Sequence, residues 1–300
     1  MTEHDGPDAD PDAAGTLTWR ELWQETTVAL GDRTHAKWMC EVASGCDSTE
    51  FQGELDQPAT HRMVAHLDAM IARRRNGEPL QYVLGSWQFR TLDLMVDQRV
   101  LIPRPETEWV CQVALDLVAD VTHRPRLVAD LGTGSGAIGL SLAAELPVGT
   151  AEVWLADVSA DALDVARANL AGIGRAGASV RVAQGSWFDA LPGHLRGAFH
   201  LVVANPPYIP DHDPAVEASV TDWEPHVALF GGEDGLRDIR AIVADAADWL
   251  ADDGWLVMEI GTGQGPAVTD LLVASGFRHV EIRNDLAGHH RTAIGRRPTR

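Results

Sequence analysis

The segment Asn205-Pro-Pro-Tyr208 directly follows the apolar run 199–204, and its residue types suit the handling of a planar –NH2 group. Prolines have no N–H to donate, so two in succession end a buried strand. The strand end then presents two acceptors on stiff backbone, the side-chain oxygen of Asn205 and the carbonyl oxygen of Pro206, while Tyr208 can pack on the planar group. The lone pair of an amide or aromatic –NH2 is delocalised, so two acceptors on its N–H bonds fix the nitrogen and favour charge developing there during an in-line displacement. The alternative is a turn that merely ends the strand.

A second group of candidate residues forms a glycine-rich turn between a strand and a helix, in the segment 128–138. Gly132, Gly134 and Gly136 permit a tight turn and let a ligand lie against bare backbone at a helix N-terminus. Their G-x-G-x-G spacing differs from the G-x-G-x-x-G of dinucleotide sites. Asp130, two residues earlier, would repel a pyrophosphate but attract an ammonium group. S-adenosylmethionine carries such a group, so it is the expected cofactor.

The ends of the next two predicted strands supply complementary groups. Asp157 stands where an acid can accept hydrogen bonds from both hydroxyls of a ribose. Trp187 follows the third strand, where its ring can stack on adenine. A glycine turn alone is often only a tight connection. Three such groups at the carboxyl edge of one sheet predict a nucleoside cofactor site.

An α/β fold must position these residues, because strands and helices alternate from residue 126 onward. Strands are expected at 126–131, 152–157, 179–184, 199–204 and 255–260, and helices near 137–146, 160–171, 236–251 and 265–275. This alternation predicts a doubly wound, mostly parallel sheet covered by helices on both faces. The segments 280–283 and 292–295 flank a polar turn, which predicts one antiparallel strand near the sheet edge.

The first hundred residues have a different pattern and predict separate regions. A small helical bundle is expected over 17–76, with a capping box at Thr18 and Glu21, a second helix over 34–44 that stops at Gly45, and a long helix that starts near Pro58. The β-rich pieces 81–84, 87–89 and 92–96 predict a β-hairpin linker over 77–105. The acidic residues 1–16 predict a disordered tail. The α/β domain then covers 106–300.

The composition of the 300 residues limits the classes of function. The net charge of −20 and the pI near 4.8 disfavour an extended non-specific grip on nucleic acid phosphates. No apolar run is long enough for a membrane span, and the acidic N-terminus is no signal peptide. Three cysteines without metal spacing predict reduced thiols and no metal site. We therefore expect a cytoplasmic protein with no membrane partner and no direct nucleic acid partner.

Several segments together resemble the HemK/PrmC family, the release factor glutamine N5-methyltransferases. The resemblance covers residues 77–297 well and the N-terminal bundle by its helical character. The matching segments are Gly77–Leu80, Leu101–Glu108 (LIPRPETE), Asp130–Ile138, Asn205–Ile209, Glu224–Leu229, Gly231–Leu236 (GGEDGL) and Glu259–Gly265. The Asn-Pro-Pro-Tyr motif is shared with adenine-N6 methyltransferases, whereas the LIPRPETE and GGEDGL blocks are far more specific.

The resemblance implies a Rossmann-like class I S-adenosylmethionine-dependent methyltransferase. Its substrate would be the side chain of the glutamine in the Gly-Gly-Gln tripeptide of class 1 release factors. A tripeptide is too small to give specificity, so we expect the helical bundle, 17–76, to recognise the protein substrate. We also expect a monomer. The residues expected at the cofactor are Asp130, Gly132, Thr133, Gly134, Ser135, Gly136, Asp157, Trp187 and Asn205. Those expected to hold the glutamine are Asn205, Pro206, Pro207 and Tyr208, with Asn205, Pro206 and Tyr208 catalytic. Arg104 and Glu106 would shape the pocket, although Arg104 could instead pair with a neighbouring acid. Ser186 stands where relatives often have an acid, so the adenine contacts there are not predicted.

Three alternatives share part of this pattern. A glutamine methyltransferase that acts on a ribosomal protein would use identical chemistry. An adenine-N6 methyltransferase would need base flipping and a basic channel, which neither the charge nor the length offers. A cofactor-dependent adaptor that binds a translation factor without modifying it would not need two aligned acceptors.

Overall fold

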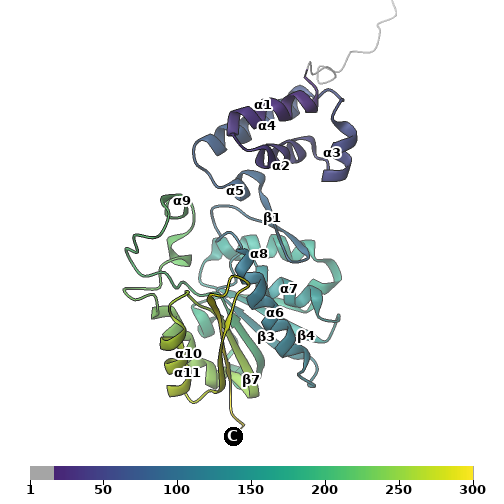
Figure 1. Cartoon of the computed structure of the whole chain (residues 1–300). Helices are drawn as coiled ribbons and strands as arrows, with labels where there is room; N and C mark the ends of the chain where they lie inside the picture. Colours follow the sequence, from purple (N-terminus) through teal and green to yellow (C-terminus); the bar gives the residue numbers. More distant parts are fainter. Residues whose placement is uncertain (1–16, 300) are drawn as a thin grey trace, which may run out of the picture. The chain divides into compact units, whose positions relative to one another are not determined.

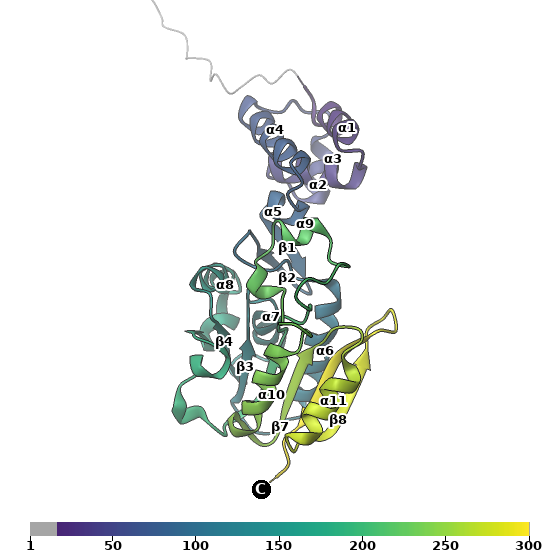
Figure 2. The same cartoon turned by 90° about the vertical axis from the view of Figure 1, so that its left-hand side faces the viewer.

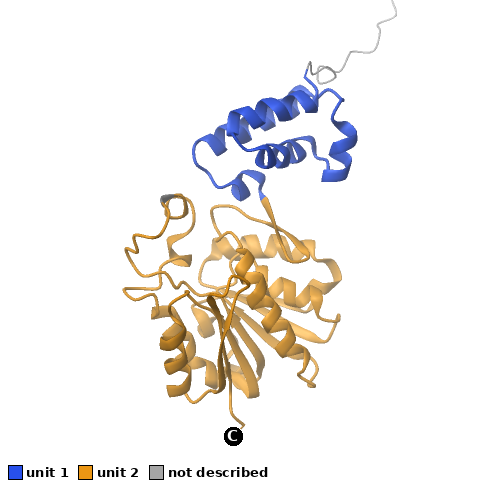
Figure 3. Ribbon diagram, viewed as in Figure 1, with its two compact units in different colours: residues 1–85 blue, residues 86–300 orange. Residues whose placement is uncertain are grey.

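The structure, a computed structural model, describes residues 17–299 and divides the chain into two compact units (Figure 3). The first unit ends at Gly85 and the second begins at Ser86. The expected acidic tail, 1–16, lies outside the described residues. Within the described range, no helix has the length and apolar character needed to cross a membrane. In the same range, no group of three or more His, Cys, Asp or Glu side chains is placed to hold a metal ion.

The first unit is built from helices, shown in purple and blue in Figure 1. They are α1 (Trp19–Leu30), α2 (Arg33–Ser44), α3 (Ser48–Glu54), α4 (His61–Arg75) and α5 (Leu80–Leu84). The structure has the predicted capping box: Thr18 Oγ1 accepts from the Glu21 N–H at 3.3 Å, and Glu21 Oε2 accepts from the Thr18 N–H at 2.8 Å. Gly45 stops α2 with a left-handed backbone, φ +74°.

Two short helices of this unit differ from the sequence prediction. Helix α3 has seven residues, too few to show a helical period in the sequence. The segment 81–84, expected to be β-rich, belongs to helix α5. The Arg73 guanidinium donates to the carbonyls of Tyr82 at 2.8 Å and Val83 at 3.4 Å, which satisfies acceptors at the end of this helix. Because Arg73 lies on α4, the local pattern could not reveal this support.

The second unit contains a seven-stranded sheet in the order β5-β4-β3-β6-β7-β9-β8, preceded by an antiparallel hairpin of β1 and β2. The strands are β1 (Ser86–Phe89), β2 (Leu92–Met95), β3 (Arg126–Leu131), β4 (Ala151–Asp157), β5 (Val180–Gln184), β6 (Phe199–Ala204), β7 (Leu250–Glu259), β8 (Arg278–Asn284) and β9 (His290–Arg296). Strands β3 to β7 pair in parallel, and β9 runs antiparallel to both β7 and β8. The predicted mostly parallel sheet with one reversed strand near its edge is confirmed.

Helices cover both faces of this sheet (Figure 2). Helices α6 (Pro105–Ala119), α7 (Ala137–Glu145) and α8 (Ala160–Gly172) pack in one core, and α10 (Arg237–Trp249) and α11 (Gly265–Ala274) pack in the other. Successive strand residues point to opposite faces, so buried Val128 belongs to the first core and buried Ala129 to the second. The remaining short pieces are helix α9 (Ala218–Thr221) and 3₁₀ turns at 174–179, 187–190, 193–195 and 226–228.

The strand order reverses at β3, and this reversal determines where a ligand fits. The chain runs from β3 outward to β4 and β5, then returns to place β6 on the other side of β3. Ligands bind in such sheets beyond the carboxyl ends of the strands at this switch point. Leu131 and Ala204, the last residues of β3 and β6, are paired in register. The glycine turn at Gly132 and the motif beginning at Asn205 therefore leave the sheet side by side.

Candidate active site

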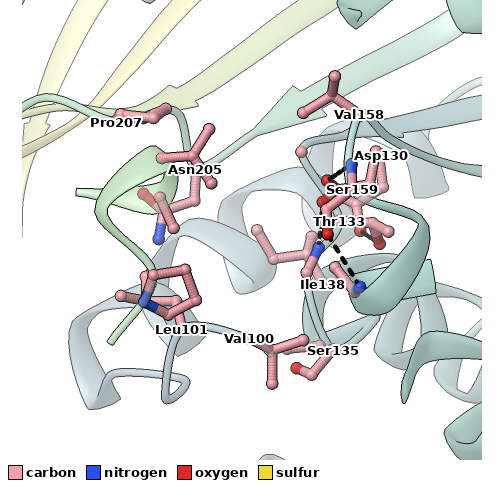
Figure 4. A pocket seen from close by; sticks show the side chains of 18 of the residues that line it. Val100, Leu101, Asp130, Thr133, Ser135, Ile138, Val158, Ser159, Asn205 and Pro207 are labelled. Atoms are coloured by element: carbon pink, nitrogen blue, oxygen red, sulfur yellow. Dashed lines mark hydrogen bonds between the residues drawn. The ribbon is translucent and has the colours of Figure 1, made fainter. Parts of the chain in front are cut away.

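A cavity of about 280 Å³ lies at this edge of the sheet. The expected residues that line it are Asp130, Gly132, Thr133, Gly134, Ser135, Asp157, Trp187, Asn205 and Pro207. The expected residues that are not among its lining are Gly136, Pro206, Tyr208, Arg104 and Glu106. Figure 4 shows Asn205 and Pro207 on one side of the cavity and Asp130, Thr133 and Ser159 on the other. The glycine turn and the Asn-Pro-Pro-Tyr motif thus border one cavity.

The glycine turn is held open by its own backbone and by Asp157. Gly132 has a left-handed backbone, φ +69°, and a Cβ there would lie 3.1 Å from the Trp187 ring. Only glycine allows this approach without displacing the indole. Asp157 Oδ2 accepts from the Gly134 N–H at 2.9 Å, and its Oδ1 accepts from the Ser159 N–H at 2.9 Å. Each carboxylate oxygen retains a lone pair for a ligand hydroxyl. Burial raises the pKa of Asp157 above its ordinary value.

Asp130 is fully buried at the end of β3 and lines the cavity. Its Oδ2 accepts from Thr133 Oγ1 at 2.6 Å and from the Gly139 N–H at 2.8 Å. No group among residues 17–299 donates to its Oδ1, which is also buried. Burial raises the pKa of this carboxyl to about 6. A buried carboxylate oxygen without a partner is costly, so a cationic ligand group beside it would be stabilised.

Trp187 begins a 3₁₀ turn, 187–190, immediately beyond β5. Its backbone has φ +45°, an uncommon value for a residue with a side chain, and this conformation places the ring against Gly132. The neighbouring Ser186 is exposed and also lines the cavity. The indole therefore forms a half-buried apolar wall above the glycine turn.

Two other loops hold the backbone at the C-terminal end of the Asn-Pro-Pro-Tyr segment, at Tyr208 and at the next residue, Ile209. The Ile209 N–H donates to the Leu229 carbonyl at 3.1 Å, and the Gly231 N–H donates to the Ile209 carbonyl at 2.8 Å. Gln264 Nε2 donates to the carbonyls of Tyr208 at 2.9 Å and Gly235 at 3.1 Å. Pro206 and Pro207 are buried. These hydrogen bonds add to the stiffness that the two prolines give the segment.

The hydroxyls of Tyr208 and Thr107 both donate to one buried carboxylate, Glu259, at the end of β7, and the Asn205 amide is linked to it through Thr107. Glu259 is 1% exposed. Its Oε1 accepts from the Tyr208 hydroxyl at 3.1 Å, and its Oε2 accepts from Thr107 Oγ1 at 2.6 Å. Asn205 Nδ2 in turn donates to Thr107 Oγ1 at 3.3 Å. Burial raises the pKa of Glu259, and burial together with the nearby Glu259 charge raises the pKa of Tyr208.

Arg104 and Glu106 occupy positions outside the cavity lining. Arg104 forms a short ion pair with Glu224, which is 4% exposed. The sequence left open a pairing with a neighbouring acid, whereas this partner is far away in the sequence. The other oxygen of Glu224 accepts from the Ile102 N–H at 3.1 Å. Glu106 is exposed in the first turn of α6. This ion pair joins the segment before α6 to the loop beyond β6.

Sequence reasoning did not single out Thr107, Glu259 or Gln264. All three lie in blocks that carry the family resemblance, Leu101–Glu108 and Glu259–Gly265. The sequence signal that could have indicated these residues is a polar side chain on an otherwise apolar strand or helix face, within a block that resembles a family of enzymes. Glu259 fits this description, because the four residues before it, 255–258, are apolar.

Two family models match the chain. The one described as PrmC N-terminal domain matches residues 24–85, and the one described as Methyltransferase small domain matches residues 114–222. Among solved structures, the METTL16 MTase domain (crystal form 2) is 16% identical with a TM-score of 0.50, over 79% of this chain and 80% of that chain. At that identity the likeness concerns the fold alone.

Curated relatives match over most of their length. A release factor glutamine methyltransferase of Burkholderia pseudomallei is 42% identical over 89% of this chain and 93% of its own length. The proteins of the same name from Escherichia coli strain K12 and Pseudomonas aeruginosa are 33% and 45% identical. These matches cover 92% and 76% of this chain, and 96% and 79% of those relatives.

Proposed function

The chain belongs to the family of release factor glutamine methyltransferases, and we propose that it transfers a methyl group from S-adenosylmethionine to the side-chain amide nitrogen, N5, of the glutamine in the Gly-Gly-Gln motif of class 1 release factors. We further propose that it acts in the cytoplasm as a monomer. The observation that carries the proposal is the register of β3 and β6, which places Gly132 and Asn205 side by side on one cavity. A nucleoside cofactor and a planar amide can then meet at one sheet edge.

The cavity residues fit S-adenosylmethionine in charge and shape. The Oδ1 of Asp130, which receives no donor from residues 17–299, suits the ammonium of the methionine part. Asp157 suits the ribose hydroxyls, and the Trp187 ring offers a stacking surface for adenine. Gly132 to Gly136 provide bare backbone beside it. When bound, the cofactor supplies an electrophilic methyl group on a sulfonium.

The Asn-Pro-Pro-Tyr segment then serves to hold the glutamine amide. Asn205 Oδ1 and the Pro206 carbonyl accept its two N–H bonds, which fixes the nitrogen and stabilises the positive charge that develops on it. Tyr208, although it is not among the residues that line the cavity, is proposed to pack on the amide plane. Because the prolines and Gln264 hold the backbone, these acceptors are already in place before the substrate arrives.

The proposal is tested by the intact mass of a class 1 release factor after incubation with the protein and S-adenosylmethionine. One added methyl group, located on the glutamine of Gly-Gly-Gln by peptide fragmentation, is the expected result. A release factor whose glutamine is changed to alanine should gain no mass. Methylation of a ribosomal protein or of adenine in nucleic acid, with the release factor unmodified, would contradict the proposal.

Cofactor affinity should depend strongly on Asp157. Asp157→Ala removes the acceptor proposed for the ribose and also the brace on the Gly134 N–H. Loss of hydrogen bonds to a charged group predicts weaker binding by about 1.5–3 kcal/mol. Isothermal titration with S-adenosylmethionine measures this change, and Asp157→Asn, which keeps one acceptor oxygen, should lose less. An unchanged dissociation constant in both variants would assign the ribose to another group.

Cofactor binding should also weaken as the pH falls through about 6, where Asp130 becomes protonated. The neutral acid cannot attract an ammonium, so the dissociation constant measured from pH 8 to pH 5 should rise at the acidic end. Asp130→Asn should bind more weakly at pH 8 and show a flatter profile. The stability of the ligand-free protein should depend on pH in the opposite direction from cofactor binding. The folded-state pKa is raised from 3.8, so this group's contribution to stability is fully present below that value and is lost as the pH rises through about 6.

We propose that the helices of residues 17–76 recognise the protein substrate. A tripeptide offers little binding energy, so contacts remote from the glutamine must supply it. A variant that begins at Ser86, where the second compact unit starts, should bind S-adenosylmethionine but methylate a full-length release factor poorly. A short Gly-Gly-Gln peptide should react equally slowly with both forms. Circular dichroism must first show that the shortened protein folds, and equal rates on the release factor would refute the role.

A further inference from the structure

We propose that Glu259 and Thr107 are positioning residues that determine which way round the Asn205 amide stands, so that its carbonyl oxygen, and not its NH2 group, meets the substrate. This inference rests on the proposed function. Asn205 and Pro207 line the cavity together with Thr107, whereas Glu259 is not among the lining residues. Glu259 thus acts on the glutamine only through the side chains it holds.

The amide of an asparagine has no intrinsic preference for either orientation. Its oxygen and nitrogen are nearly the same size, and a half-turn of the amide plane exchanges an acceptor for a donor. The proposed chemistry tolerates only one of the two. An oxygen toward the glutamine accepts an N–H bond, while an NH2 toward it would set two donors against each other. Something in the protein must therefore break the symmetry.

The buried carboxylate of Glu259 selects one orientation of the Asn205 amide through the direction of its hydrogen bonds. An ionised Glu259 has only lone pairs, so the protons of the Thr107 and Tyr208 hydroxyls both point toward it, at 2.6 Å and 3.1 Å. Because the single hydroxyl proton of Thr107 is donated to Glu259, Thr107 Oγ1 can only accept a further hydrogen bond. The group that faces it must donate, which selects Nδ2 of Asn205. No group among residues 17–299 donates to the Oδ1 of Asn205, which is left for the substrate.

The surroundings of Glu259 favour its role as an acceptor. Arg291, on β9, donates to the Tyr208 hydroxyl at 3.5 Å, and its charge favours an ionised Glu259. Burial and the charge of Glu106 on α6 oppose ionisation. If Glu259 takes up a proton, it can donate to Thr107 Oγ1. The Thr107 hydroxyl is then free to donate to Asn205 Oδ1, and the amide can turn its NH2 to the substrate.

The test replaces each member of the chain by an isosteric side chain. In Glu259→Gln, an amide NH2 can donate to Thr107, which permits the wrong orientation. Single-turnover methylation at saturating cofactor and release factor should fall about 10²-fold, near the loss expected from removing one preorganised polar group. Thr107→Val removes the acceptor and should also slow turnover, and Thr107→Ser should restore most of that loss. The KM for the release factor and the cofactor affinity should change much less than kcat.

Two readouts separate positioning from general support of the fold. Because Glu259 acts through Thr107, the losses in Glu259→Gln and Thr107→Val should not multiply in the double variant. At saturating cofactor, where the weaker binding caused by protonation of Asp130 does not contribute, the single-turnover rate of the wild-type protein should fall at acidic pH as Glu259 is protonated. Glu259→Gln should lack that fall. Tyr208→Phe is the control, because it removes the other hydroxyl that donates to Glu259 and leaves Thr107 intact. In the Tyr208→Phe background the losses from Glu259→Gln and Thr107→Val should still not multiply.

A third readout needs neither cofactor nor activity. The side-chain NH2 of Asn205 can be assigned by NMR from its absence in Asn205→Ala. Its exchange with water should be slow in the wild-type protein and faster in Glu259→Gln and Thr107→Val. If the wild-type protein failed to methylate release factors, this exchange would still report the orientation. If Glu259→Gln does not fold, the pair Thr107→Val and Thr107→Ser decides. Wild-type rates and unchanged exchange in the Thr107→Val variant would overturn the inference.

Discussion

Replacing Asn205 by alanine should slow methyl transfer in a single turnover by a factor on the order of 10²–10³, the usual cost of one preorganised polar group that acts on developing charge. The Asn205 side chain is half-buried at a strand end, and its contact with Thr107 is a single hydrogen bond of 3.3 Å. Alanine removes the acceptor without adding bulk. The substrate nitrogen then loses one of the two groups that fix it, so the loss should fall on the chemical step.

The measurement should use saturating S-adenosylmethionine and release factor, so that binding does not contribute. The melting temperature should move little, and the cofactor dissociation constant should change less than the rate. Asn284→Ala, at an exposed asparagine on the edge strand β8, is the matched control and should keep the wild-type rate. An Asn205→Ala variant with an unchanged single-turnover rate would mean that the motif is only a turn.

Much of the fold could be predicted because it follows from local patterns. The alternation of strands and helices from residue 126 predicted the parallel sheet, and apolar runs located β3 and β6. The carboxyl-edge rule then brought the glycine turn and Asn205 together, although the sequence alone did not establish that β3 and β6 are neighbours in register. That pairing joins residues more than 70 positions apart and depends on the topology of the whole sheet.

The hydrogen-bonded chain behind the site could not be predicted from local patterns. Thr107, Asn205 and Glu259 come from α6, the end of β6 and the end of β7, and only the folded sheet brings them together. The burial of Glu259 is likewise a tertiary property, since an acid at a strand end is ordinarily solvated. Arg104 shows the same limit, because its partner Glu224 lies 120 positions away.

A second large effect should come from Gly231, which lies against the backbone of the Asn-Pro-Pro-Tyr motif without belonging to the cavity lining. A Cβ at this position would overlap the carbonyl oxygen of Pro207 and approach that of Gly235 to 2.8 Å. Both obstacles are backbone, so neither can rotate away. Gly231→Ala should therefore displace the Pro207 peptide and, with it, the carbonyl of Pro206 that is proposed to hold the glutamine.

Because a misplacement of about 1 Å can cost on the order of 10² in rate, Gly231→Ala should lower kcat by about that factor. The added methyl should also lower stability by about 1–3 kcal/mol, as overpacking does, which thermal unfolding can measure. Gly263→Ala is the matched control, since Gly263 is exposed and a Cβ there would meet no described atom within 4 Å. Cofactor affinity should survive in both variants, because the glycine turn belongs to a different strand. A Gly231→Ala enzyme could instead have a lower melting temperature and still turn over at the wild-type rate. That result would show that the loop adjusts without moving the two acceptors, and that the proposed rigidity of the motif plays no part in the rate.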